Sequence, residues 1–113
     1  MKIKFEKTMK IASELLSYCH HFGATEYHLD ILQEETAVTI AIRAKPENIT
    51  EDELSRVREA LTAPRQRDVE QDYWELIGET DFSSEIPLVG MLCDDATVEY
   101  RDKELLITLV RHD

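Results

Sequence analysis

The chain has 113 residues, 42% of them hydrophobic, which suits one domain with one core, residues 1–113. It carries 24 acidic and 13 basic side chains, for a formal net charge of -11 at pH 7. This charge repels nucleic-acid phosphates and anionic lipids, so we expect no nucleic-acid and no membrane partner. No apolar run approaches the roughly 20 residues that span a bilayer, and the first ten residues lack the apolar segment of a secretion signal. We therefore expect a cytoplasmic protein.

The first third of the chain predicts a helix followed by a hairpin. Apolar side chains recur at every third or fourth position between Phe5 and Phe22, which is typical of one long helix with a wide apolar face. Gly23 is suited to end this helix, because glycine enters the left-handed conformation easily. Residues 27–31 and 38–42 then alternate apolar and polar side chains around "QEET", which predicts an antiparallel hairpin.

The rest of the chain predicts three further helices and a second hairpin. Thr50 and Glu53 have the spacing of a capping box, and apolar residues at 54, 57 and 61 continue a second helix that Pro64 ends. A third helical pattern covers residues 66–78, and a short fourth one covers 88–94. Residues 96–100 and 105–109 alternate around the turn "RDKE". The predicted order is α-β-β-α-α-α-β-β.

This order predicts the α+β class: a two-layer α/β sandwich in which helices cover one face of a four-stranded antiparallel sheet. Apolar residues occupy one side of each predicted strand, and most residues on the other side are polar. Leu32, Leu106 and Val110 fall on the polar side. They are either scattered exposed residues or a patch where a partner docks, and the sequence leaves both interpretations open.

Cysteine and histidine spacing argues against a metal site. Cys19 and Cys93 lie inside apolar patterns, which predicts two buried thiols and not a disulfide. Cys19, His20 and His21 are consecutive on a predicted helix, so their side chains point about 100° apart and cannot converge on one ion. Trp74 lies in the third helical pattern and fits either the core or an interface.

Three stretches give the chain a resemblance to a known superfamily. They are "ELLSYCHHFGATEYHLDI", "AVTIAIRAKPENITEDEL" and "PLVGMLCDDATVEYRDKELLITLVR". Their order and texture resemble the histidine-kinase-like ATPase superfamily (GHKL, or Bergerat fold), and most closely its small bacterial anti-sigma-factor-like kinases. The resemblance implies a Bergerat-like sandwich that binds nucleotide between its helical layer and a mobile lid.

In that superfamily the first helix supplies a catalytic glutamate and, one turn later, an asparagine that binds Mg²⁺. The corresponding positions here are Glu14 and Tyr18. A phenol is a poor ligand for Mg²⁺, which prefers carboxylate, carbonyl or water oxygens. Without the metal, Glu14 has nothing to activate, and its ordinary interpretation is a solvated helix glutamate.

The other nucleotide motifs are altered as well. Ala44 takes the place of the aspartate that binds adenine, and Pro46 and Asn48 fall in the glycine region that follows. A buried adenine would then leave a polar group without a partner, at a cost of about 1 to 3 kcal/mol. The resemblance places Glu85 and Pro87 at glycines of the phosphate lid and Leu105 at a threonine of the last hairpin. All these changes weaken phosphate and base recognition.

The sequence therefore predicts a regulatory or protein-interaction module without catalytic residues, cofactor or metal, on a fold that has lost ATP binding. Its expected partner is a protein, and a homodimer is one such arrangement. The alternative is a divergent anti-sigma-factor-type serine protein kinase that uses Glu14 with ATP and Mg²⁺. A third hypothesis is that the former adenine pocket holds another small ligand.

Overall fold

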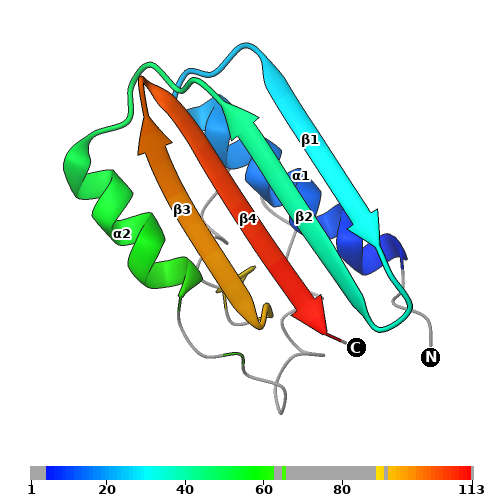
Figure 1. Cartoon of the computed structure of the whole chain (residues 1–113). Coiled ribbons are helices and arrows are strands. Elements are labelled where there is room, and N and C mark those ends of the chain that lie inside the picture. The colour runs from blue at the N-terminus through cyan, green and yellow to red at the C-terminus, as the bar shows by residue number, and fades with distance from the viewer. Residues whose placement is uncertain (1–4, 63–64, 66–88, 91, 113) are drawn as a thin grey trace.

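The computed structural model describes residues 5–62, 65, 89–90 and 92–112 (Figure 1). The described elements are α1 (Phe5–His21), β1 (Tyr27–Gln33), β2 (Ala37–Ala44), α2 (Glu51–Leu61), β3 (Asp95–Arg101) and β4 (Glu104–His112). The α+β class and both predicted hairpins are confirmed. The third predicted helix, with Trp74, and the lid positions Glu85 and Pro87 lie outside the described residues.

The four strands form one antiparallel sheet in the order β1-β2-β4-β3. The second hairpin therefore joins the first through its last strand, because β4 pairs with β2. Ile42 of β2 pairs with Ile107 of β4, and Ala44 pairs with Leu105. The outer strands β1 and β3 are the two edges of the sheet (Figure 1).

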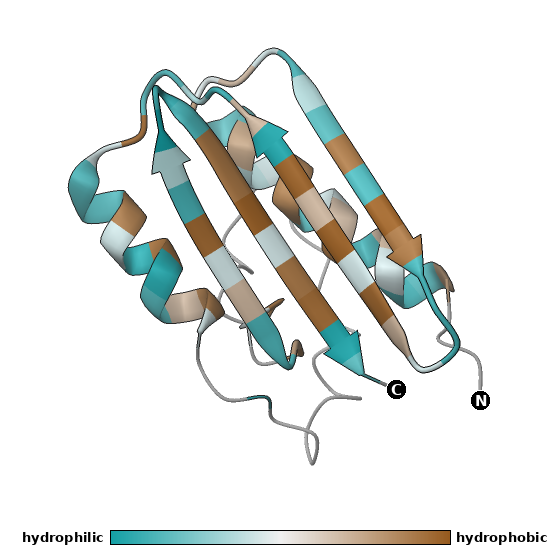
Figure 2. Cartoon of the chain, in the orientation of Figure 1, coloured by the Kyte–Doolittle hydropathy of each residue, from teal (hydrophilic) through white to brown (hydrophobic). Residues whose placement is uncertain are grey.

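One face of the sheet packs against the core. Alternate residues of the central strands are buried there. In Figure 1, α1 lies behind β1 and β2, and α2 lies beside β3. The hydropathy colouring shows the same alternation as brown and pale or teal bands along β2 and β4 (Figure 2). The largest fully buried side chains of this core include Ile11, Leu15, Ile40, Ile42, Leu54, Leu61, Leu105, Ile107 and Leu109.

The opposite face of the sheet is open in the described part of the chain. Leu32 and Val110 lie in one row across it, one on each side of Thr39, and Leu106 lies further along β4 beside Arg43. Leu32 is 59% exposed, whereas Leu106 and Val110 are half-buried by their neighbours on the sheet. The three leucine and valine side chains that were predicted on the polar side are therefore on this open face.

Both described helices begin or end at the predicted residues. Gly23 has φ 93°, and the N–H of Ala24 donates to the carbonyl of Cys19 (3.1 Å), which closes the end of α1. Thr50 caps α2 by accepting the N–H of Glu53 at 3.1 Å. The capping box is only half formed, because the Glu53 side chain accepts hydrogen bonds from other residues.

The predicted fourth helix, residues 88–94, is confirmed in part and is shorter than predicted. Val89 and Gly90 are helical, but the N–H groups of Leu92 and Cys93 bond three residues back, at 3.0 and 3.4 Å, in the manner of a tight turn. The N–H of Asp94 then donates to the carbonyl of Val110 (2.9 Å). The chain thus joins the sheet before the helix can continue beyond this turn.

Candidate functional site

Tyr18 connects the two helices at the position that the resemblance assigns to a magnesium ligand. Its side chain is 3% exposed, and its hydroxyl donates to Oε2 of Glu53 at 2.8 Å. The ring also packs on Phe22, with 5.0 Å between the ring centroids. Because Glu53 belongs to the first turn of α2, this hydrogen bond fixes α2 against the buried face of α1.

The environment of Tyr18 keeps its hydroxyl protonated. Burial is the main cause, and the hydrogen bond to Glu53 and the negative charge of that carboxylate act in the same direction, so the pKa of Tyr18 is raised well above its usual value. A protonated phenol donates its one hydrogen to Glu53 and is neutral. Tyr18 therefore offers neither an anionic metal ligand nor a base near neutral pH.

Glu14 is buried, which corrects its interpretation as a solvated glutamate. Its side chain is 4% exposed. The reason is its place on the helix: it lies three residues after Ile11 and four before Tyr18, so it shares their core-facing side. Carboxylates are rarely this buried without a partner in the protein. Glu14 and Tyr18 are thus on the same, core-facing side of α1.

The adenine-site positions also lie in packed surroundings. Ala44 is 3% exposed, and Leu105, its neighbour on β4, is fully buried. Pro46 is buried as well. Asn48 uses its backbone N–H to donate to the carbonyl of Phe22 (2.8 Å), and its side chain lies against Gly23. This amide is therefore engaged in joining the end of α1 to the segment before α2.

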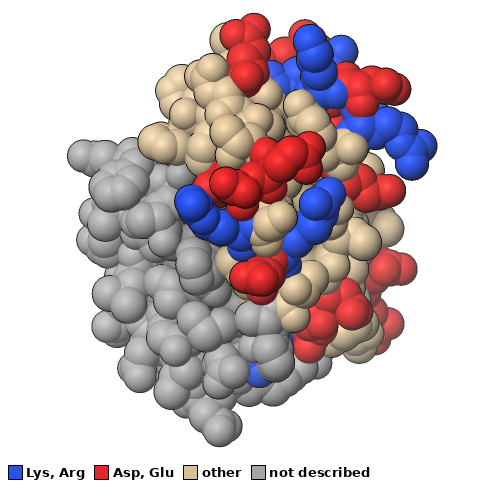
Figure 3. Space-filling view, turned by 90° about the vertical axis from the view of Figure 1, so that its left-hand side faces the viewer, with Lys and Arg blue, Asp and Glu red and all other residues tan. Residues whose placement is uncertain are grey.

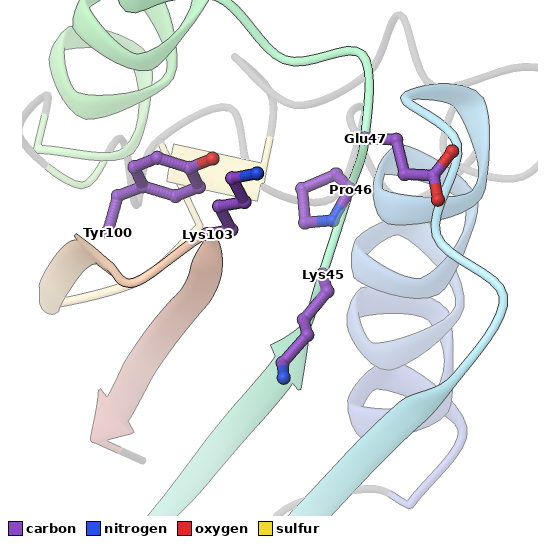
Figure 4. A pocket seen from close by; sticks show the side chains of 5 residues that line it. All are labelled: Lys45, Pro46, Glu47, Tyr100 and Lys103. Atoms are coloured by element: carbon purple, nitrogen blue, oxygen red, sulfur yellow. The ribbon is translucent and has the colours of Figure 1, made fainter.

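Two pockets open beside these residues, at the end of the sheet where β2 leaves it. The larger has a volume of about 430 Å³ and is lined by Lys45, Pro46, Glu47, Tyr100 and Lys103 (Figure 4). In Figure 4 the Tyr100 and Lys103 side chains lie on one side of it and Pro46 faces them, while the Lys45 amine points away. The smaller pocket, of about 250 Å³, shares Lys45 and Glu47.

The turn that carries Lys103 has an unusual backbone. Asp102 and Lys103 have φ values of 53° and 64°. Two successive left-handed residues are typical of a tight hairpin turn that matches the twist of its strands, and glycine or asparagine is favoured there. The turn "RDKE" was predicted from sequence, but the position of Lys103 at a pocket was not.

The Cys19 thiol is not a nucleophile near neutral pH. Cys19 and Cys93 are buried and unlinked, as predicted. Burial raises the pKa of Cys19 to about 12, so its reactive thiolate is scarce at pH 7. Within the described ranges, no group of three or more His, Cys, Asp or Glu side chains could hold a metal ion. None of the helices in that part of the chain is long and apolar enough to cross a membrane.

Sequence reasoning missed the structural roles of two polar residues, Glu53 at the site and Arg111 at the far end of β4. Glu53 was assigned to the capping box, and nothing in the sequence pairs it with Tyr18, 35 positions away. Arg111 is 5% exposed and donates through a guanidinium N–H to the carbonyl of Leu92 (2.7 Å). A signal for its burial was present, because Arg111 continues the buried alternation of positions 105, 107 and 109 in β4.

Comparison with models of known protein families gives no match to this chain, and comparison with curated protein sequences gives none either.

We expect Tyr18→Phe to lower the free energy of unfolding by about 1 to 2 kcal/mol. The change removes the hydroxyl but keeps the ring, so the loss measures the hydrogen bond to the Glu53 carboxylate. Urea denaturation of the variant and the parent gives this difference. Tyr27→Phe is the matched control: its hydroxyl donates to the carbonyl of Ala24 (2.8 Å) at a more exposed site, so a smaller loss is expected. Equal stability of Tyr18→Phe and the parent would contradict a structural role for this bond.

Proposed function

We propose that this protein is a non-catalytic regulatory module that acts by binding another protein. Its fold is then a Bergerat-like two-layer sandwich in which the chain's own side chains fill the nucleotide site. The observation that carries the proposal is the hydrogen bond of 2.8 Å between Tyr18 and Glu53. It joins α1 to α2 at the position where the resemblance implies bound Mg²⁺.

The neighbouring positions support the same conclusion. Adenine binding at Ala44 would bury the polar amino group of the base against a methyl group. The alanine side chain has no acceptor for that amino group. The N–H of Asn48, in the region where glycines would approach a nucleotide, already donates to Phe22. Binding a nucleotide would therefore require these packed contacts to break, without the interactions that normally offset such a cost.

A nucleotide titration tests the proposal. In isothermal titration calorimetry with Mg²⁺ present, we expect ATP, ADP and a non-hydrolysable ATP analogue to give no heat beyond dilution, at nucleotide concentrations up to about 1 mM. Inorganic tripolyphosphate is the matched control, because it tests attraction of phosphate to Lys45 and Lys103 without a base. A micromolar dissociation constant for ATP that tripolyphosphate does not share would contradict the proposal.

The second candidate function is the divergent serine protein kinase, and the burial of Glu14 favours it. A carboxylate that is 4% exposed beside the implied metal position is where a catalytic base would be placed. A phosphotransfer assay with radiolabelled ATP and a co-purified partner distinguishes the two. Transfer that is lost in Glu14→Gln would support the kinase, and absence of transfer in the parent protein supports the regulatory module.

A further inference from the structure

The two edges of the sheet differ in how they are covered. Beside β3 lies α2, whose Arg58 donates from Nε to the carbonyl of Val98 on that edge strand (3.3 Å). Acidic and basic side chains are interspersed over this side of the molecule (Figure 3). At the opposite edge, no described strand or helix lies beyond β1 in the plane of the sheet (Figure 1). An edge strand of seven residues without cover is a template for pairing with another strand.

The backbone groups on the open side of β1 can be assigned from its hairpin. The N–H of Glu34 donates to the carbonyl of Ala37 (2.8 Å), and this bond closes the turn between β1 and β2. In an antiparallel ladder, successive residues direct their N–H and C=O groups to opposite sides. The pairing of β1 with β2 therefore leaves Tyr27, Leu29 and Ile31 with their N–H and C=O groups directed to the outer edge.

Exposed apolar side chains are confined to the same side of the molecule. In the described part of the chain, the large hydrophobic residues that are exposed are Phe5 (58%), Met9 (42%) and Leu32 (59%). All three belong to α1 or β1, and α1 lies behind the β1–β2 side of the sheet (Figure 1). The side chains of Leu29 and Ile31 on β1 are only half-buried against the core. Exposed apolar side chains therefore lie on both sides of the sheet in the half of the molecule that contains the β1 edge.

We propose that a second copy of this chain pairs with β1, strand to strand and antiparallel, about a two-fold axis at Leu29. The two four-stranded sheets then form one sheet of eight strands. In this register Tyr27 faces Ile31 of the other copy on the core side, and His28 faces Asp30 of the other copy on the open side. Each pair occurs twice, because the contact is symmetric.

Charge complementarity selects this register. Both side chains of the His28–Asp30 pair are exposed. Nε2 of His28 lies 2.8 Å from Oε2 of Glu26 in its own chain, so in the dimer the imidazole lies between that carboxylate and Asp30 of the other copy, which is a favourable cross-strand arrangement. Moving the axis to Asp30 would place the two Asp30 carboxylates directly opposite each other. Moving it further, to Ile31, would place Asp30 opposite the apolar Leu32. Shifting one copy of β1 by a single residue relative to the other is excluded. Side chains alternate between the two faces of a strand, so this shift would place the apolar side of one β1 on the open face.

The proposal is tested by sedimentation equilibrium of the full chain from about 1 μM to about 1 mM, with charge variants of β1. We expect a reversible monomer–dimer equilibrium. His28→Glu places a carboxylate opposite Asp30 twice per dimer, so it should weaken dimerisation on the order of tenfold. Adding Asp30→Lys to His28→Glu restores opposite charges at both contacts, and the double variant should return to within about threefold of the parent.

A matched control adds the same charge at the other edge. Thr97 is exposed on β3, and Thr97→Glu should leave the dimer constant unchanged. Circular dichroism checks that each variant is folded. A parent protein that stays monomeric at every concentration overturns the proposal, and so does a dimer that His28→Glu does not weaken. Loss of the dimer without recovery in the double variant would overturn the register. These outcomes are independent of nucleotide binding.

Discussion

Gly90→Ala is expected to lower the free energy of unfolding by about 3 kcal/mol, because the added methyl group has no space. A Cβ at this position would lie 1.9 Å from the carbonyl oxygen of Ala60 and 3.0 Å from Cα of Leu61. Both atoms belong to the backbone at the end of α2, so no side-chain rotation relieves the clash. Either α2 moves away from the core or the segment at Val89 and Gly90 does, and both shifts expose residues that are now buried.

Urea denaturation of Gly90→Ala measures the effect, and Gly23→Ala is the matched control. Gly23 has φ 93°, which strains alanine, but the atom nearest to its added Cβ is Nδ2 of Asn48 at 2.8 Å, at the end of a side chain that can rotate. We expect about 1 kcal/mol there. A Gly90→Ala protein as stable as the parent, or a larger loss at Gly23, would show that α2 does not pack against Gly90 in this way.

Local patterns were sufficient to predict much of the fold. Alternation in β2 and β4 predicted that Ile40, Ile42 and Ile107 face the core, and all three are buried. Gly23 was correctly placed at the end of α1, because its role depends on a few neighbouring residues. The order of strands in the sheet depends on contacts between distant segments. No spacing within the sequence indicates that β4 lies between β2 and β3.

The candidate site shows why polar contacts are harder to predict. Helical spacing placed Tyr18 on the apolar face, but its partner Glu53 had a plausible local role as a capping residue. Glu14 was assigned to solvent because it is charged, although its spacing from Ile11 and Tyr18 indicated the core side. The charge of Glu14 indicated solvent and its position on the helix indicated the core, and the position was the better guide. The same conflict applies to Arg111 in β4.

These contacts also determine how the site differs from an open nucleotide pocket. The end of α1 is bonded to the segment before α2 through Phe22 and Asn48, and to α2 itself through Tyr18 and Glu53. Both connections use residues at or beside positions that the resemblance assigns to nucleotide binding. The pocket that is open lies next to them, around Tyr100 and Lys103. These bonds therefore hold the two helices together at this end of the sheet.

Stability should decrease above pH 9, because two neighbouring buried acids in α1 are held protonated. Burial raises the pKa of Cys19 from 9.0 to about 12 and also raises the pKa of Tyr18 above 10.0. The unfolded chain loses these protons first, so the stabilisation is complete below the unfolded pKa values and is lost as pH rises toward the folded ones. At about 1.4 kcal/mol per pH unit, the Cys19 thiol alone gives a loss of about 3 kcal/mol by pH 11, and Tyr18 adds to it in the same direction.

Urea denaturation at pH 8, 9, 10 and 11 measures this decrease, and two variants separate its sources. Cys19→Ala should remove the part of the slope that begins near pH 9, because alanine has no proton to lose. Tyr18→Phe should remove the part that begins near pH 10. Other tyrosines and lysines also titrate in this range. The test is therefore the difference in the free energy of unfolding between each variant and the parent at each pH. If Cys19→Ala and the parent lose stability in parallel from pH 9 to 11, the thiol is not held protonated by the fold, and the packing of α1 against the sheet around it is looser than described.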